Sequence, residues 1–282
     1  MKSTSLCYPC FLKQAHSSVS FLTEDEQRRV EVLKEISKML PGLDSAKNPA
    51  YNSTLVLLKV NELMGAVDPY EDARKKYDRL AMELVPELRG EIEASADPLE
   101  MSVRMSVVGN VIDLGIKEKV DISGTLELAK GEGFKIFEFD AFKSELQKSK
   151  RVLYILDNAG EIVFDSLAIE QMRKLGKAVI AVVKGGPILN DAIMDDAKRV
   201  GLDKLCKVID TGSNYVGVER EKCSPVFLKA LDTAELVIAK GQGNYETLEG
   251  TRANIFFILK AKCEAVAEHL GVDVGDLVLK RA

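Results

Sequence analysis

The stretch that decides the fold is Arg151 to Glu161, which reads RVLYILDNAGE. Apolar and aromatic residues run from Val152 to Leu156 and stop at Asp157, and a helical pattern then runs from Glu161 to Leu175. A short apolar run bounded by turn residues predicts a buried strand. Three further runs of this kind follow, with helical patterns between them: Ala178–Val183, Leu205–Ile209 and Leu236–Ala239. Strands that alternate with helices predict an α/β protein with a parallel sheet covered on both faces.

The chain before this stretch carries helical signals almost throughout. Thr23 and Glu26 predict a capping box at the start of a helix in which Val30, Leu33 and Ile36 recur at helical spacing. Further helices are expected over Ser53–Met64, Tyr70–Val85 and Met101–Leu114, and a strand over Phe134–Phe139. We therefore predict a helical N-terminal subdomain, residues 1–115, and an α/β catalytic domain, residues 116–282.

Composition excludes several classes of protein. The 282 residues are 46% hydrophobic and 29% charged, which is the balance of a globular chain. The net charge of −5 has the wrong sign for a protein that neutralises nucleic-acid phosphates. No run approaches the ~18 apolar residues of a membrane-spanning helix, and the first residues lack the apolar block of a secretion signal. Five cysteines cannot all pair within one chain, so we expect a protein of the reducing cytoplasm. From the charge and the missing apolar run, we expect neither nucleic acid nor membrane as its partner.

Each predicted strand of the second half runs into polar or glycine-rich residues at its carboxyl end. These loops begin at Asp157, Lys184, Asp210 and Lys240, and the second of them includes Asp191. Ligands bind at this edge of an open parallel sheet, so the loops are expected to converge on one cleft. Any single loop is better explained as an ordinary turn or helix cap, because glycine, asparagine and aspartate serve those purposes too. Four such loops together favour a site.

The side chains in these loops indicate a metal and a phosphate. The oxygens of Asp157, Asn158 and Asp191 suit a hard divalent cation such as Mg²⁺ or Mn²⁺, whereas glycine-rich backbone and lysines suit phosphate. With two histidines in the chain, a zinc site built from a histidine cluster is not expected. Lys184 and Lys240 are expected at the mouth of the cleft, where they would neutralise phosphate oxygens, unless they are solvated strand ends.

Other phosphate-handling templates fit poorly. The chain has no Gly-Lys-Ser/Thr loop, and Gly241-Gln242-Gly243 lacks the third small residue of a dinucleotide fingerprint. Ala159 stands where an enzyme that forms a phospho-aspartate carries a second aspartate. Attack by a metal-directed water is therefore the expected mechanism, with Asp157, Asp191 and Lys240 as catalytic residues.

Several segments resemble, in order along the chain, the signature segments of the damage-control phosphatases, formerly catalogued as domain of unknown function 89. They are Cys7–Cys10, Gly109–Asp113, Asp157–Glu161 with Phe164-Asp165, Lys184–Asp191 and Lys240–Glu246. The Cys-x-x-Cys pair indicates the short prokaryotic branch of the family.

The resemblance implies a helical part packed on a Rossmann-like α/β domain. It implies a divalent metal, Mg²⁺, Mn²⁺, Co²⁺ or Ni²⁺, held by Asp157, Asn158 and Asp191, and hydrolysis of small phosphometabolites such as sugar phosphates or damaged phosphorylated intermediates. The residues that match the substrate-binding segments are Asn110, Asp113, Lys184, Gly186, Asn244 and Glu246.

The sequence leaves two other functions open. One is a carboxyl methyltransferase that uses S-adenosylmethionine, although no Gly-x-Gly-x-Gly segment follows the first strand of the α/β part, and the other is a non-catalytic sensor of phosphometabolites. The role of Cys7, Cys10 and Cys263 is open between a structural metal cluster, a redox-sensitive pair and buried reduced thiols. Cys206 is expected in the core.

Overall fold

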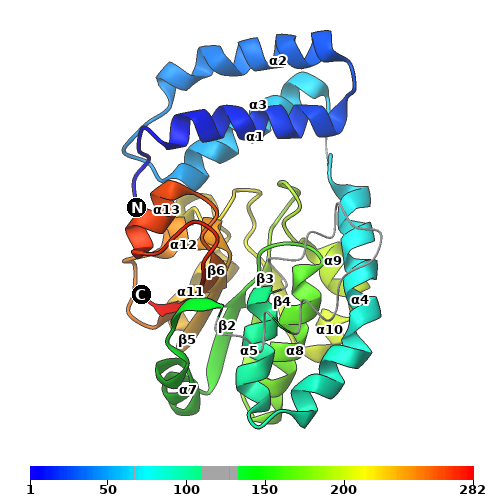
Figure 1. Ribbon diagram of the computed structural model, residues 1–282, viewed down its shortest axis with the longest axis vertical. Helices are drawn as coiled ribbons and strands as arrows, with labels where there is room; N and C mark the ends of the chain where they lie inside the picture. The colour runs from blue at the N-terminus through cyan, green and yellow to red at the C-terminus, as the bar shows by residue number, and fades with distance from the viewer. Residues whose placement is uncertain (67, 109–126, 128–132) are drawn as a thin grey trace.

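The computed structural model describes residues 1–66, 68–108, 127 and 133–282. Its centre is a seven-stranded sheet in the order β1-β7-β6-β5-β2-β3-β4 (Figure 1). Neighbouring strands are parallel except β6 and β7, which are antiparallel. The strands are β1 Phe134–Phe137, β2 Arg151–Ile155, β3 Ala178–Val183, β4 Lys207–Asp210, β5 Leu236–Lys240, β6 Ile255–Lys260 and β7 Leu277–Arg281. The predicted α/β class with a mostly parallel sheet is confirmed.

Side chains of the central strands alternate between two cores, one on each face of the sheet. On β2, Tyr154 belongs to the first core, and Leu153 and Ile155 belong to the second. The helices that contribute to the first core are α4 Glu71–Ala94, α5 Pro98–Val108, α7 Phe139–Lys148, α8 Glu161–Lys174, α9 Met194–Arg199 and α10 Leu202–Leu205. Those of the second core are α11 Pro225–Thr233, α12 Gln242–Leu248 and α13 Glu264–Leu270. Helices therefore cover both faces, as parallel sheets require.

Three helices form a separate layer stacked on one end of the α/β part (Figure 1). They are α1 Cys7–Leu22, α2 Glu26–Met39 and α3 Pro49–Met64, with the 3₁₀ turn η1 Leu40–Gly42 between the last two. Their own core includes Phe11, Val19, Ile36 and Val56. Because α4 and α5 pack into the core of the sheet instead, the first 108 residues are divided between two cores. The division into residues 1–115 and 116–282 stays a prediction.

Two local predictions are corrected. The N-cap of α2 is Asp25, whose carboxylate accepts the amides of Gln27 at 2.9 Å and Arg28 at 3.2 Å. The Thr23 hydroxyl instead accepts the amide of Asp25, so the predicted capping box is wrong. The strand expected from Leu205 begins at Lys207, because α10 occupies the preceding residues.

Several elements were not predicted: the helices α1, α7, α10, α12 and α13, the strands β6 and β7, and the 3₁₀ turn η2 Arg220–Lys222. The predicted helix Met101–Leu114 overlaps α5, and its residues 109–114 lie outside the described part of the chain. Within that part, no helix is both long and apolar enough to span a membrane.

Candidate active site

Two loops at the carboxyl edge of the sheet are joined by backbone hydrogen bonds. Asn158, in the loop after β2, forms an antiparallel bridge with Asp191, in the loop after β3. The amide of Ala192 donates to the carbonyl of Asp157 at 2.8 Å, and the amide of Ala159 donates to Asn190 at 2.9 Å. Because β2 and β3 are parallel neighbours in register, both loops leave the same edge of the sheet. The structure thus brings Asp157, Asn158 and Asp191 side by side.

The two aspartates repel each other electrostatically. Burial, together with the negative charges of Asp191 and Glu161, holds the pKa of Asp157 well above its usual range. Burial also raises the pKa of Asp191, although the amine of Lys184 lies 3.6 Å from Asp191 Oδ2 and opposes the shift. Asp191 Oδ2 is buried and has no hydrogen-bond partner among the described residues. Asp157 and Asp191 are called the acidic cluster below. Two acids with these properties are stabilised by a cation between them.

Gly241, at the start of α12, leaves room for the Asp157 carboxyl group. Its φ of +79° is in the left-handed region, and a Cβ atom at this position would overlap the Asp157 carboxylate. Only glycine satisfies both the backbone conformation and the close approach of that side chain. The loop after β5 therefore closes one side of the acidic cluster.

Lys240 lies beneath this cluster, and its expected position at the mouth of the cleft is wrong. The side chain is fully buried, since every residue of β5 is inside the protein. Its amine donates to Glu161 Oε1 at 2.5 Å, to Asp165 Oδ1 at 2.7 Å and to the carbonyl of Ser106 at 2.8 Å. With three partners, the ammonium group has no hydrogen left for a substrate.

Glu161 connects Lys240 to the acidic cluster. The amide group of Asn158 donates to Asp157 Oδ2 at 2.8 Å and to Glu161 Oε2 at 3.3 Å. Behind them, the Tyr154 hydroxyl donates to Asp165 at 2.8 Å. Sequence reasoning gave Glu161, Asp165 and Tyr154 no role. For the two acids the sequence carried a signal: Glu161 and Asp165 are four residues apart, which puts them on one face of a helix.

The other predicted substrate residues occupy varied positions. The expected position of Lys184 at the mouth of the cleft is wrong too, because the side chain is buried and donates to the carbonyl of Gly217 at 2.6 Å. The Asn244 amide nitrogen donates to the carbonyls of Lys240 at 2.6 Å and Leu156 at 3.2 Å, while its Oδ1 has no partner among the described residues. Gly186 is half-buried. Asn110 and Asp113 lie outside the described residues.

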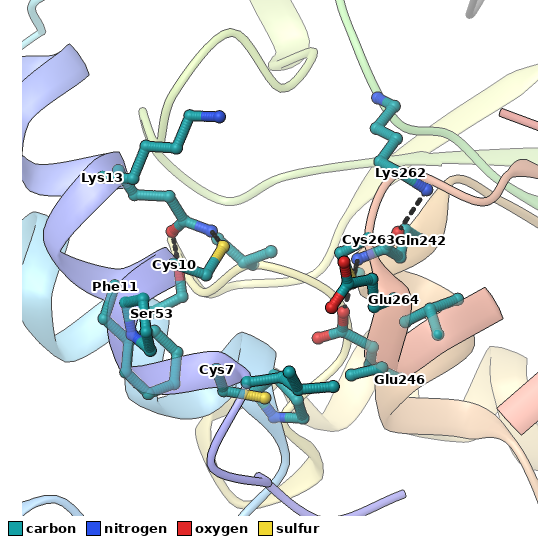
Figure 2. Close-up of a pocket in the computed structure, with 18 of the residues that line it drawn as sticks. Cys7, Cys10, Phe11, Lys13, Ser53, Gln242, Glu246, Lys262, Cys263 and Glu264 are labelled. Atoms are coloured by element: carbon teal, nitrogen blue, oxygen red, sulfur yellow. Dashed lines mark hydrogen bonds between the residues drawn. The ribbon is translucent and has the colours of Figure 1, made fainter. Parts of the chain in front are cut away.

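Glu246 faces a separate cavity of about 530 Å³, shown in Figure 2. It accepts a hydrogen bond from Gln242 at 2.8 Å, and burial raises its pKa to about 7. Cys7, Cys10 and Cys263 line the same cavity, and all three thiols are free. Within residues 1–66, 68–108, 127 and 133–282, no three His, Cys, Asp or Glu side chains are grouped closely enough to hold one metal ion. This arrangement does not support a thiolate metal cluster.

Cys206 is buried in the first core, as predicted.

Lys262 is a further residue to which the sequence analysis assigned no role. It lies between β6 and α13, is exposed, and lines the edge of the cavity (Figure 2). Its positive charge lowers the pKa of both Asp157 and Asp191, so the side chain acts on the acidic cluster as well. The residue could not be found from the sequence because the strand before it was not predicted.

Comparison with known proteins identifies the class. The sequence profile of the damage-control phosphatase ARMT1-like domain matches residues 3–278. A damage-control phosphatase of Archaeoglobus fulgidus is 34% identical over 99% of this chain and 99% of its own length. Damage-control phosphatase PH1575 of Pyrococcus horikoshii is 34% identical over 100% of this chain and 98% of its own. The chain therefore belongs to the damage-control phosphatase ARMT1-like family.

A solved structure agrees with this assignment. The crystal structure of PH1575, described as a DUF89 family protein, matches the fold with a TM-score of 0.91 at 34% identity, covering 100% of this chain and 99% of that one. The uncharacterized protein MJ0202 of Methanocaldococcus jannaschii is 37% identical over 97% of this chain and 93% of its own. The assignment to a short prokaryotic branch stays a prediction.

Proposed function

We propose that this chain is a phosphatase that depends on a divalent metal and hydrolyses small phosphorylated metabolites. Membership of the damage-control phosphatase family and the names of two full-length relatives support the reaction class. The observation that carries the metal dependence is the meeting of Asp157, Asn158 and Asp191 across two loops joined by a backbone bridge.

The donor set fits a hard divalent cation. Two carboxylates and one amide oxygen match the oxygen ligands of Mg²⁺ or Mn²⁺, and such sites leave other positions for water and substrate. Asp191 Oδ2 is buried and has no hydrogen-bond partner within the described part of the chain, and the mutual repulsion of the acids supplies a further reason to bind a cation. Co²⁺ and Ni²⁺ are compatible with the same oxygens. When bound, the ion would supply Lewis-acid polarisation of the phosphate and a more acidic water.

The surrounding residues have separate tasks in this proposal. Lys262 binds the phosphate dianion, because it is exposed, lines the cavity and carries a positive charge that lowers the pKa of Asp157. Lys184 balances the charge of Asp191 from inside the protein. Lys240 holds Glu161, and Glu161 in turn holds the Asn158 amide group with its oxygen free. Lys240 is thereby a supporting residue, and it does not contact the substrate.

The cavity next to Lys262 suits the non-phosphate part of a small metabolite. Its volume of about 530 Å³ accommodates a sugar, and it is lined by Ser53, Gln14 and Glu246. A hydroxyl, an amide and a carboxyl group lining one cavity are the partners that a polyhydroxylated ligand needs. We therefore propose sugar phosphates and related phosphometabolites as the substrate class.

A metal-reconstitution assay tests the proposal. Chelated protein should hydrolyse p-nitrophenyl phosphate and sugar phosphates only after Mg²⁺, Mn²⁺, Co²⁺ or Ni²⁺ is added. Asp157→Ala should lose at least about 100-fold of this activity. Asp232→Ala is the matched control, because Asp232 forms an exposed ion pair with Arg220. Activity that survives both chelation and Asp157→Ala would discard the proposal.

The same preparation separates the two other functions. Binding of phosphate esters without turnover would indicate a sensor. Calorimetric binding of S-adenosylmethionine to the chelated protein would favour methyl transfer.

A further inference from the structure

A buried ion network lies behind both loops of the acidic cluster. Asp78, on α4, is fully buried, and its Oδ1 accepts the backbone amide of Gly160 at 2.8 Å. Its Oδ2 accepts a hydrogen bond from Arg199 at 2.5 Å, and Arg199 also donates to Asp196 at 2.6 Å. Asp196 and Arg199 both belong to α9, which follows the Asp191 loop. Asp78 thus connects an N-terminal helix to the surroundings of the site.

The network reaches the backbone of both loops. Gly160 follows Asn158 by two residues, and Asp78 holds its amide. On the other loop, Ile193 follows Asp191 by two residues, and its amide donates to Asp196 Oδ2 at 2.9 Å. The outer end of the network is Arg74, which donates to Asp196 at 2.9 Å and to both oxygens of Asp68.

Gly160 is the position where this support matters most. Its φ of +78° turns the chain from the Asp157–Ala159 loop into α8, and its amide is buried. A buried amide without an acceptor is costly, so the turn depends on a carboxylate at the position of Asp78. The backbone bridge between Asn158 and Asp191 joins the two loops directly. Asp78 and Arg199 join them a second time, through Gly160 on one loop and α9 after the other.

We propose that Asp78 is a positioning residue for metal binding: by holding the Gly160 amide, it fixes the distance between Asp157 and Asp191. The inference rests on the proposed function, since it assumes that these aspartates share a cation. Residues that orient metal ligands change metal affinity by about 10–100-fold when they are replaced. Helix α4, which packs into the first core of the sheet, would therefore help to set the affinity of the metal site.

Two substitutions separate position from charge. Asp78→Asn keeps an oxygen acceptor for the Gly160 amide but removes the charge and the acceptor of the Arg199 hydrogen bond. Asp78→Glu keeps the charge but moves the carboxylate by one methylene. Mn²⁺ affinity, measured by electron paramagnetic resonance on the full chain, should fall by less than about 5-fold in Asp78→Asn and by about 10–100-fold in Asp78→Glu. The KM for p-nitrophenyl phosphate at saturating Mn²⁺ should stay unchanged in both variants.

The control is Asp68→Asn, at the outer end of the same network, which should bind Mn²⁺ within about 2-fold of the unsubstituted chain. Thermal unfolding confirms that each variant is folded at the assay temperature. Equal losses in Asp68→Asn and Asp78→Glu, or a larger loss in Asp78→Asn than in Asp78→Glu, would overturn the inference. An unsubstituted chain that binds Mn²⁺ without hydrolysing phosphate esters would overturn the proposed function but leave the role of Asp78 measurable.

Discussion

The amine of Lys240 lies 2.5 Å from the carboxylate of Glu161, and neither side chain is exposed to solvent. Asp165 lies 2.7 Å from the same amine, so one buried cation pairs with two buried acids. Removing one partner of a buried ion pair leaves an uncompensated charge. This relationship assigns Lys240 to the support of the site.

Lys240→Met should therefore lower the free energy of unfolding by about 3–5 kcal/mol, measured by denaturant titration. The matched control is Lys75→Met, which breaks an ion pair of the same 2.5 Å length on the surface. It should leave the free energy of unfolding almost unchanged, because both side chains are exposed. A Lys240→Met variant that is as stable as the control but lacks phosphatase activity would restore the substrate role expected from the sequence.

Gly241→Ala should weaken metal binding. The added Cβ overlaps the Asp157 carboxylate, so that side chain must leave its position beside Asp191. We expect Mn²⁺ affinity to fall by at least about 10-fold. Gly250→Ala controls for backbone strain, because Gly250 has a φ of +71° and open space around it. That control should lose about 1–2 kcal/mol of stability and keep its metal affinity. Equal Mn²⁺ affinities in the two variants would contradict the role of Gly241.

Lys262→Ala should raise the KM for phosphate esters by about 10-fold and weaken inhibition by inorganic phosphate to a similar extent. The reason is the loss of the exposed positive charge that acts on Asp157 and Asp191. Lys207→Ala is a suitable control, since this exposed lysine begins β4 at the opposite edge of the sheet. Steady-state kinetics checks both values. An unchanged KM in Lys262→Ala would remove the residue from the phosphate site.

Glu246 should make stability depend on pH. Burial raises its pKa from 4.5 to about 7, so the folded protein holds a proton that the unfolded chain releases. A raised carboxyl pKa stabilises the fold at low pH, and this contribution is lost as pH rises from about 4.5 to 7. Glu246→Gln should therefore be more stable than the unsubstituted chain at pH 8, by about 3 kcal/mol, and equally stable near pH 4.

Denaturant unfolding across this pH range measures the difference, with Glu264→Gln as the control. Glu264 lines the same cavity but is exposed, so its replacement should leave the pH dependence unchanged. If the difference in the free energy of unfolding between Glu246→Gln and the unsubstituted chain is the same at every pH, the burial of this charge is contradicted.

The central part of the fold was readable from the sequence because it repeats one local pattern. Apolar runs predicted β2, β3 and β5, and the parallel register of β2 and β3 follows from that alternation. The strand–helix alternation continues through α12 to β6, which pairs parallel to β5, and then through α13 to β7, which pairs antiparallel to β6. Both strands were missed, although β6 reads IFFILK, because the helices on either side of β6 have only seven residues each and were not predicted.

The candidate site was partly readable for the same reason. Asp157 and Asp191 follow neighbouring strands, and the strand-end rule was enough to bring them together. The burial of Lys240 could not be predicted, because it depends on Glu161 and Asp165 projecting from α8 over the end of β5. The role of Asp78 could not be predicted either, because its hydrogen bond with Gly160 joins residues 82 positions apart in the sequence.

The shared cation is tested most directly by titrating Mn²⁺ into metal-free protein and counting bound ions by electron paramagnetic resonance. The unsubstituted chain should bind one Mn²⁺ ion, whereas Asp157→Ala and Asp191→Ala should each lose that ion while remaining folded. Either variant binding Mn²⁺ with unchanged stoichiometry and affinity would contradict a metal site shared by these two carboxylates.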